Sequence, residues 1–213
     1  MALAATKAPW PAEFVTASPE TLGLIMLGAD PHAGRLERPA QLAAVADALA
    51  DGTATARALQ ERFPGRTPCE LAHELGLPVE TTDDDPMVGT LWRFAEYRPR
   101  PPRIVLYNRG LAPLERTLTG SLAEELLGQA TPRQVFVAHE LYHHAETIRS
   151  DVPIARRHRP TLFRIGNWHW RTGIVALAEI AAGAFAQSLL DLPCHPKILD
   201  YVATRSLSNR TVA

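Results

Sequence analysis

The chain has 213 residues, of which 46% are hydrophobic, and a formal net charge of −1. This length predicts one domain with a sizeable core, and the balanced charge gives no reason to expect nucleic acid or a membrane surface as a partner. Two cysteines, Cys69 and Cys194, are too few for a disulfide framework. No long apolar run precedes a cleavage site near the start, so we expect a cytoplasmic protein.

The first 66 residues predict a helical N-terminal region whose role the sequence does not indicate. Residues 1–20 are rich in Pro and Ala and predict an irregular arm, with Trp10 and Phe14 as anchors. Apolar residues then recur at helical spacing in several segments. The predicted helices cover 21–27, 39–49 and 54–63.

A further helix begins after Thr67, which forms a capping box with Glu70 and is followed by Pro68 at the first helical position. This helix ends near Gly76. Its last residues resemble part of a helix-turn-helix motif. The region lacks a recognition helix rich in Arg, Lys, Asn or Gln, so direct contact with nucleic acid is not expected.

The middle of the chain predicts a small sheet, because residues 77–81, 88–97 and 103–107 are rich in β-branched and aromatic residues. The last two segments flank a Pro- and Arg-rich turn and are expected to pair antiparallel. The strand Arg103–Asn108 is expected to hold an extended peptide by edge pairing. A short helix over 122–127 ends near Gly128.

The segment Thr131–Arg149 predicts one well-delimited helix. Thr131 is a good N-cap, Pro132 suits the first helical position, and Gln134 completes a capping box. An apolar stripe at helical spacing then places one side of the helix on the core.

This helix carries the pattern His-Glu-x-x-His at His139, Glu140 and His143. Two imidazoles four residues apart lie about 40° apart around a helix, so both can reach one ion. Glu140 projects about 100° from His139 and can take a proton from a water molecule without becoming a ligand. The chain holds a partial copy at His73-Glu74 in which Leu77 replaces the second His, and we interpret that copy as structural.

Glu179 is the expected third ligand. It lies in the almost entirely apolar segment Gly173–Leu190, which predicts a buried core helix rather than a membrane span. A carboxylate at the middle of such a helix is costly unless it is paired or binds a metal, and His, His, Glu is a recurring zinc set. A buried salt bridge to an Arg is the alternative. Glu146 could replace Glu179 as ligand or orient His143.

The order of these segments resembles the ImmA/IrrE family of zinc metallo-endopeptidases. The resemblance covers about residues 67–193 and rests on the strand at 104–108, the helix segment 134–143 and the pattern Glu-x-x-Ala-x-x-Phe-Ala at 179–186. Members are intracellular and typically cleave a helix-turn-helix repressor. The resemblance implies an α+β, zincin-like metallopeptidase domain over 67–213, with a small sheet packed on the His-Glu-x-x-His helix and a Glu-bearing helix.

Residue by residue, the resemblance makes His139, His143 and Glu179 the Zn²⁺ ligands and Glu140 the catalytic acid/base. The expected function is zinc-dependent hydrolysis of a peptide bond in an intracellular protein. A metal-binding module that sequesters a repressor without cleaving it, and a small-peptide aminopeptidase, are the alternatives.

Tyr142 stands where the family usually has Gly, which would narrow the space near the metal. Oxyanion stabilisation needs another donor, for which the sequence offers four candidates. These are His158, His169, Tyr142 and Tyr201, among which we favour His169, between two Trp residues.

Overall fold

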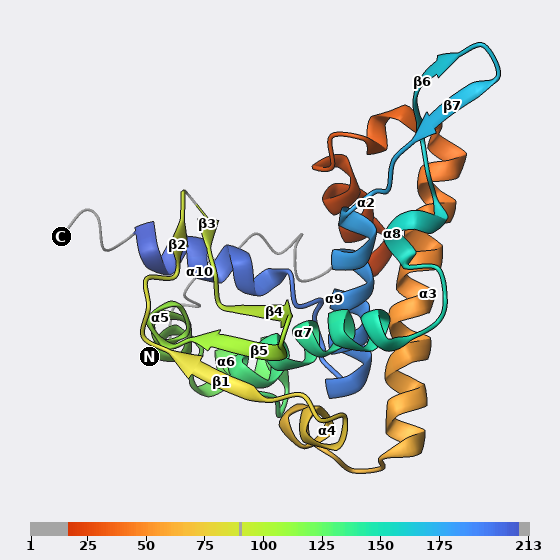
Figure 1. Ribbon diagram of the computed structural model, residues 1–213. Helices are drawn as coiled ribbons and strands as arrows, with labels where there is room; N and C mark the ends of the chain where they lie inside the picture. Colours follow the sequence, from red (N-terminus) through yellow and green to blue (C-terminus); the bar gives the residue numbers. More distant parts are fainter. Residues whose placement is uncertain (1–16, 90, 209–213) are drawn as a thin grey trace.

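The computed structural model (Figure 1) describes residues 17–89 and 91–208. Within these ranges the chain has an α+β fold in which a small mixed sheet packs with one side against helices (Figure 1). The expected anchors Trp10 and Phe14 lie outside the described residues. None of the described helices is both long and apolar enough to cross a membrane.

The N-terminal helices are longer than the sequence predicts. Helix α2 begins after Ser18, whose side chain accepts a hydrogen bond from the Thr21 backbone N–H at 3.2 Å. The two helices expected at 39–49 and 54–63 are one continuous helix, α3. The elements of this region are α2 (Pro19–Gly28), the 3₁₀ turn η1 (Ala33–Arg35), α3 (Arg38–Arg62) and α4 (Pro68–Glu74).

The continuity of α3 has a packing reason at Gly52. A Cβ at this position would lie 2.1 Å from the backbone oxygen of Ala181 in helix α9 (Ala176–Leu190). Gly52 is therefore a close contact between two helices rather than a break in one. Packing against α9 offsets the low helix propensity of glycine.

The central sheet has the strand order β1-β5-β4. Strands β1 (Val79–Thr82) and β5 (Pro102–Tyr107) are parallel, and β4 (Ala95–Pro99) pairs antiparallel with β5, as the sequence predicts for that pair. The predicted strand 88–97 is divided, because β2 (Met87–Val88) and β3 (Leu91–Trp92) form their own hairpin. Since β5 has a neighbour on each side, the expected edge pairing along it is wrong, and β1 and β4 are the edge strands.

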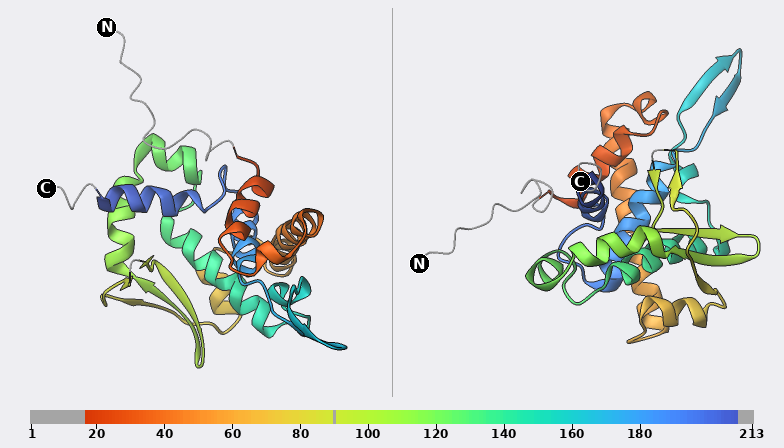
Figure 2. Two further views of the ribbon diagram at one scale, coloured as in Figure 1. Left: turned by 90° about the horizontal axis from the view of Figure 1, so that it is seen from above. Right: turned by 90° about the vertical axis from the view of Figure 1, so that its left-hand side faces the viewer.

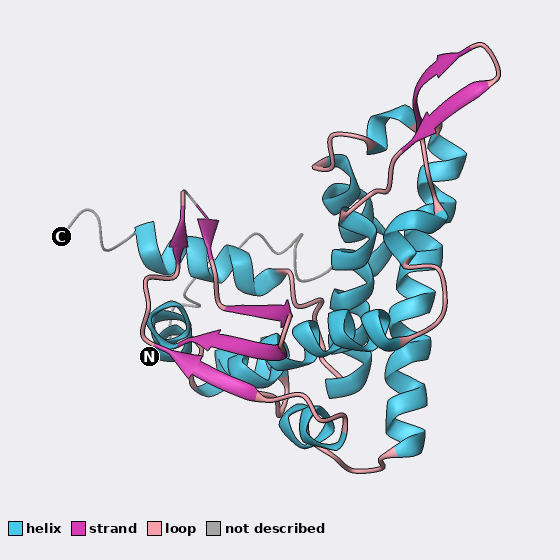
Figure 3. Ribbon diagram, viewed as in Figure 1, coloured by secondary structure: helices cyan, strands magenta, loops and turns pink. Residues whose placement is uncertain are grey.

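Helices and one hairpin complete the chain after the sheet. Helix α7 begins with the predicted capping box between Thr131 and Gln134. The β6–β7 hairpin projects away from the body of the molecule (Figure 3). The elements are α5 (Asn108–Thr117), α6 (Gly120–Leu127), α7 (Pro132–Ile148), α8 (Ile154–Arg157), β6 (Thr161–Ile165), β7 (Trp168–Arg171), α9 and α10 (Ile198–Ser208).

Helix α7 lies between two layers. It contacts β4 and β5 on one side and α9 on the other, and α3 packs along α9 (Figure 2). One hydrophobic cluster joins Val45 and Ala48 of α3 with Ile180 of α9 and Leu141 of α7. The core is thus continuous across the boundary expected at residue 66.

Replacement of Gly52 by Ala is expected to lower the free energy of unfolding by about 2 kcal/mol or more, because the added methyl group meets the backbone of α9. Chemical denaturation measures this difference. The matched control is Gly28→Ala at the end of α2, where nothing lies within 4 Å of the added atom. Equal stability of the two variants would contradict the close contact between α3 and α9.

Candidate metal centre

Two helices supply the candidate ligands. His139 and His143 lie one turn apart on α7, and Glu179 faces them from α9. The Nε2 atom of His139 lies 3.1 Å from Oε2 of Glu179, and Nε2 of His143 lies 3.5 Å from Oε1. One ligand atom from each residue lies within 4.8 Å of the others, so the three side chains could hold a single ion.

The setting of Glu179 differs from the sequence-based expectation. Helix α9 begins at Ala176, so Glu179 lies in its first turn rather than at its middle, and its side chain is 48% exposed. A carboxylate is favourable there because the N-terminus of a helix attracts negative charge. Among the described residues, its ion-pair partners are the two His residues and not an Arg.

The charges in this cluster balance one another. Burial by itself would lower the pKa of His139. The hydrogen bond to Glu179 and the charges of the nearby carboxylates outweigh burial, so the pKa of His139 is raised. Burial opposes ionisation of Glu179, but the hydrogen bond to His139 and the charge of that ring lower the pKa of Glu179 to about 2. Burial and the charge of His139 lower the pKa of His143 to about 4, so that ring is neutral and can donate a lone pair. A divalent cation can replace the proton that His139 and Glu179 share.

Glu140 lies beside the cluster without joining it. The side chain is buried, and its Oε2 atom accepts a hydrogen bond from the backbone N–H of Tyr97 in β4 at 2.7 Å. Burial raises the pKa of Glu140, against the opposing charge of His139. The sheet therefore fixes this carboxyl group, and its environment makes it a better proton acceptor than an exposed glutamate.

Glu146 and Tyr142 have other partners. The Oε1 atom of Glu146 accepts a hydrogen bond from the backbone N–H of Ile154 at 2.7 Å, and the residue is not part of the ligand cluster. The fully buried Tyr142 donates to Oδ2 of Asp51 in α3 at 2.7 Å. Tyr142 therefore lines neither cavity and its hydroxyl group is not available as an oxyanion donor, while its ring contacts the ring of His143 at 5.9 Å between centroids.

The remaining oxyanion candidates lie outside the cavities at the site. His169, the candidate that the sequence favours, is exposed on β7 rather than buried between its Trp neighbours. Nε2 of His158 pairs with Asp47 of α3 at 3.0 Å. Neither residue, nor Tyr201, lines a cavity that contains His139. The hairpin and α3 hold the two imidazoles away from the cluster.

His195 is a residue that the sequence analysis missed. It follows α9 and packs on Gly183, where a Cβ would lie 2.7 Å from its Cε1 and Nε2 atoms. Its Nδ1 accepts from the Lys197 backbone N–H at 3.2 Å, whereas Nε2 is buried without a partner among the described residues. Burial lowers the pKa of His195 to about 4, so the ring is neutral. Helical spacing carried no signal for it, because His195 lies in a loop.

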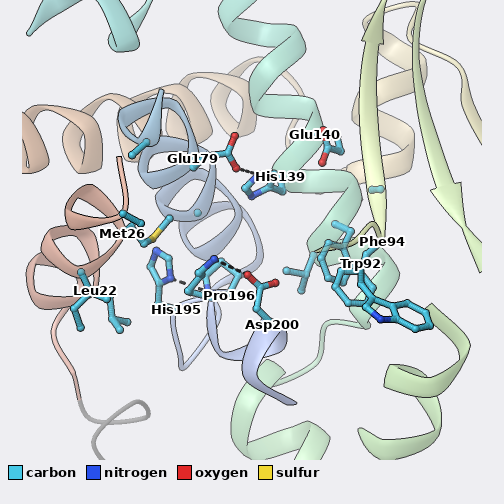
Figure 4. A pocket seen from close by; sticks show the side chains of 18 of the residues that line it. Leu22, Met26, Trp92, Phe94, His139, Glu140, Glu179, His195, Pro196 and Asp200 are labelled. Atoms are coloured by element: carbon cyan, nitrogen blue, oxygen red, sulfur yellow. Dashed lines mark hydrogen bonds and ion pairs between the residues drawn. The ribbon is translucent and has the colours of Figure 1, made fainter. Parts of the chain in front are cut away.

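Two cavities meet at the cluster. One, of about 720 Å³, lies between α2, α7 and α9. The other, of about 490 Å³, is bordered by β4 and α7. Both include His139, Glu140 and Glu179 in their walls (Figure 4 shows the larger one). The candidate ligands therefore lie where a bound chain could pass from one cavity to the other.

Comparisons of the chain with protein-family models, curated proteins and solved structures found no match.

Glu179→Ala is expected to weaken zinc binding roughly 100-fold or more, since it removes one of three ligands. Competition with a chromogenic chelator measures the dissociation constant. Glu146→Ala is the matched control, because Glu146 is also a carboxylate beside the second cavity but lies outside the cluster. If zinc binds equally to both variants and the wild type, the third ligand is another group.

Proposed function

We propose that the chain is a zinc-dependent endopeptidase with a zincin-like catalytic domain. The observation that carries this proposal is the convergence of His139, His143 and Glu179 next to the buried Glu140. Two imidazole nitrogens and one carboxylate oxygen form a set that suits zinc and leaves a fourth position open. The neutral state of His143 supports the fit, because metal binding requires an unprotonated ring.

The residues of this chain would divide the chemistry between them. When bound, zinc supplies Lewis-acid activation of a water molecule and of the scissile carbonyl group. Glu140 accepts the proton that this water loses and passes it to the leaving amine. The hydrogen bond from Tyr97 holds the Glu140 carboxyl group in one orientation through both transfers.

The free edge of β4 supports an extended polypeptide as substrate. The Tyr107 N–H donates to the Phe94 oxygen at 2.9 Å, so by antiparallel alternation the backbone groups of Ala95 and Tyr97 point away from β5. Both residues border the second cavity. The N–H of Tyr97 is taken by Glu140, so a substrate strand would pair with the backbone groups of Ala95 and with the carbonyl oxygen of Tyr97. A substrate strand pairing with β4 would pass directly beside the candidate metal ligands.

The second cavity favours an endopeptidase over an aminopeptidase. An aminopeptidase needs a carboxylate for the amine of its substrate. Glu96 pairs with Arg93 and Arg98, and Glu146 accepts from Ile154. Among the described residues lining this cavity, the other acidic groups are Glu140 and the candidate ligand Glu179.

The substrate class follows from the resemblance to the ImmA/IrrE family. That resemblance implies an intracellular protein, and more narrowly a helix-turn-helix repressor, as the substrate. It rests on the strand at 104–108 and on the segments 134–143 and 179–186, of which the last two lie on the helices α7 and α9.

Glu140→Gln is expected to lower cleavage about 10²- to 10⁴-fold while zinc affinity is retained, because Gln can still accept from Tyr97 but cannot transfer the proton. Mass spectrometry of zinc-loaded protein with a mixture of unstructured polypeptides measures cleavage. Glu146→Gln is the control and is expected to retain activity. Undiminished cleavage by Glu140→Gln would contradict the assigned role, and zinc binding without cleavage by the wild type would favour a non-catalytic metal-binding module.

A further inference from the structure

The larger cavity has two apolar walls that face each other beside the candidate metal centre. Leu22 and Met26 of α2 form one wall, and Trp92 and Phe94 lie across from them (Figure 4). His139, Glu140 and Glu179 are at one end of the cavity, so it opens directly onto the cluster. A ligand that reaches the cluster can extend a side chain between these walls.

The volume of the cavity, about 720 Å³, is in the range of small-molecule binding sites. It is ample for a large apolar side chain. Val135 and Phe136 of α7 add further apolar surface next to His139. Filling such a cavity with a matching apolar group removes that surface from water, and this is the main source of affinity in sites of this kind.

The charged residues around the cavity are paired with protein groups. Asp30 accepts hydrogen bonds from the backbone N–H groups of His32 (2.8 Å) and Ala176 (3.2 Å). Lys197 pairs with Asp200 at 2.6 Å, and Arg93 pairs with Glu96 at 2.9 Å. A charged ligand group would have to compete with these pairs, whereas an apolar group would not. Nε of Arg93 and Nε2 of His195, on two further lining residues, are buried without a hydrogen-bond partner among the described residues. The preference of the cavity for apolar groups therefore rests on its apolar walls and on the three pairs named above.

Helix α2 ties this cavity to the metal centre. It belongs to the first 66 residues, for which the sequence shows no family resemblance, and yet it packs against α9. Asp30, just after α2, binds the N–H of Ala176 at the start of α9, three residues before Glu179. The N-terminal region thus forms one side of the cavity and holds the helix that carries a candidate ligand.

We propose that this cavity is the subsite for a large apolar side chain, such as Phe, Leu or Met, of the substrate residue next to the scissile bond. This assignment rests on the proposed peptidase function for its biological meaning. The binding preference itself needs neither metal nor catalysis. In this subsite, Leu22 and Met26 of α2 select the side chain of the substrate.

The methionines offer a direct probe of the cavity, because the chain has three of them and Met26 lines it. Methyl-¹³C methionine NMR of metal-free, full-length protein would follow titration with N-acetyl-phenylalaninamide and, separately, N-acetyl-alaninamide. Met87 on β2 does not line the cavity, but it pairs with Trp92 of the opposite wall, so its signal reports on that wall. The Met26→Leu and Met87→Leu variants assign the signals.

The expected result is a saturable shift of the Met26 signal, with the phenylalanine probe binding on the order of 10- to 100-fold more tightly than the alanine probe. Equal affinity of the two probes, or no shift at Met26, would overturn the proposal.

Ile25→Asp, at an exposed position of the cavity lining, is expected to weaken binding of the phenylalanine probe roughly 10-fold. Leu42→Asp is the control on α3, exposed and outside the cavity. Equal effects of both changes would also count against the cavity.

The two proposals fail separately. Selective binding of the phenylalanine probe in a protein that neither holds zinc nor cleaves peptides would leave the apolar subsite standing and reject the peptidase. Zinc-dependent cleavage with no preference for a large apolar residue beside the scissile bond, together with equal binding of both probes, would leave the peptidase standing and reject the subsite.

Discussion

The packing of α7 against α9 is the contact on which the candidate metal centre depends, because neither helix carries all three ligands. Helix α7 supplies two imidazoles and α9 supplies the carboxylate of Glu179 that faces them. The position of α9 is in turn set by α3, which approaches so closely at Gly52 that no side chain fits between the helices. A long helix of the N-terminal region therefore supports a site to which it contributes no ligand.

The local parts of the site could be predicted from the sequence because they obey short-range rules. The capping box of Thr131 and Gln134 defines the start of α7, and the four-residue spacing places His139 and His143 on one face. The pairing of β4 with β5 also follows from adjacent segments joined by a short turn. In each case the residues that decide the structure lie within a few positions of one another.

Features that depend on distant contacts could not be predicted in this way. Whether Tyr142 points to the metal or away from it depends on Asp51, ninety-one positions earlier in the chain. The close approach of His195 depends on the missing side chain of Gly183. The sequence does not predict helix α5, because it contains Pro113, and proline is disfavoured in the interior of a helix. Tertiary packing decides all three.

The cluster joins two kinds of surface, a free strand edge on β4 and an apolar cavity walled by α2. The most direct test of this account is anomalous diffraction at the zinc edge from crystals of wild-type protein grown with zinc. The account predicts a peak about 2.0–2.2 Å from Nε2 of His139, Nε2 of His143 and a carboxylate oxygen of Glu179. A peak bound by other residues, or none at saturating zinc, would contradict the metal centre and the function proposed from it.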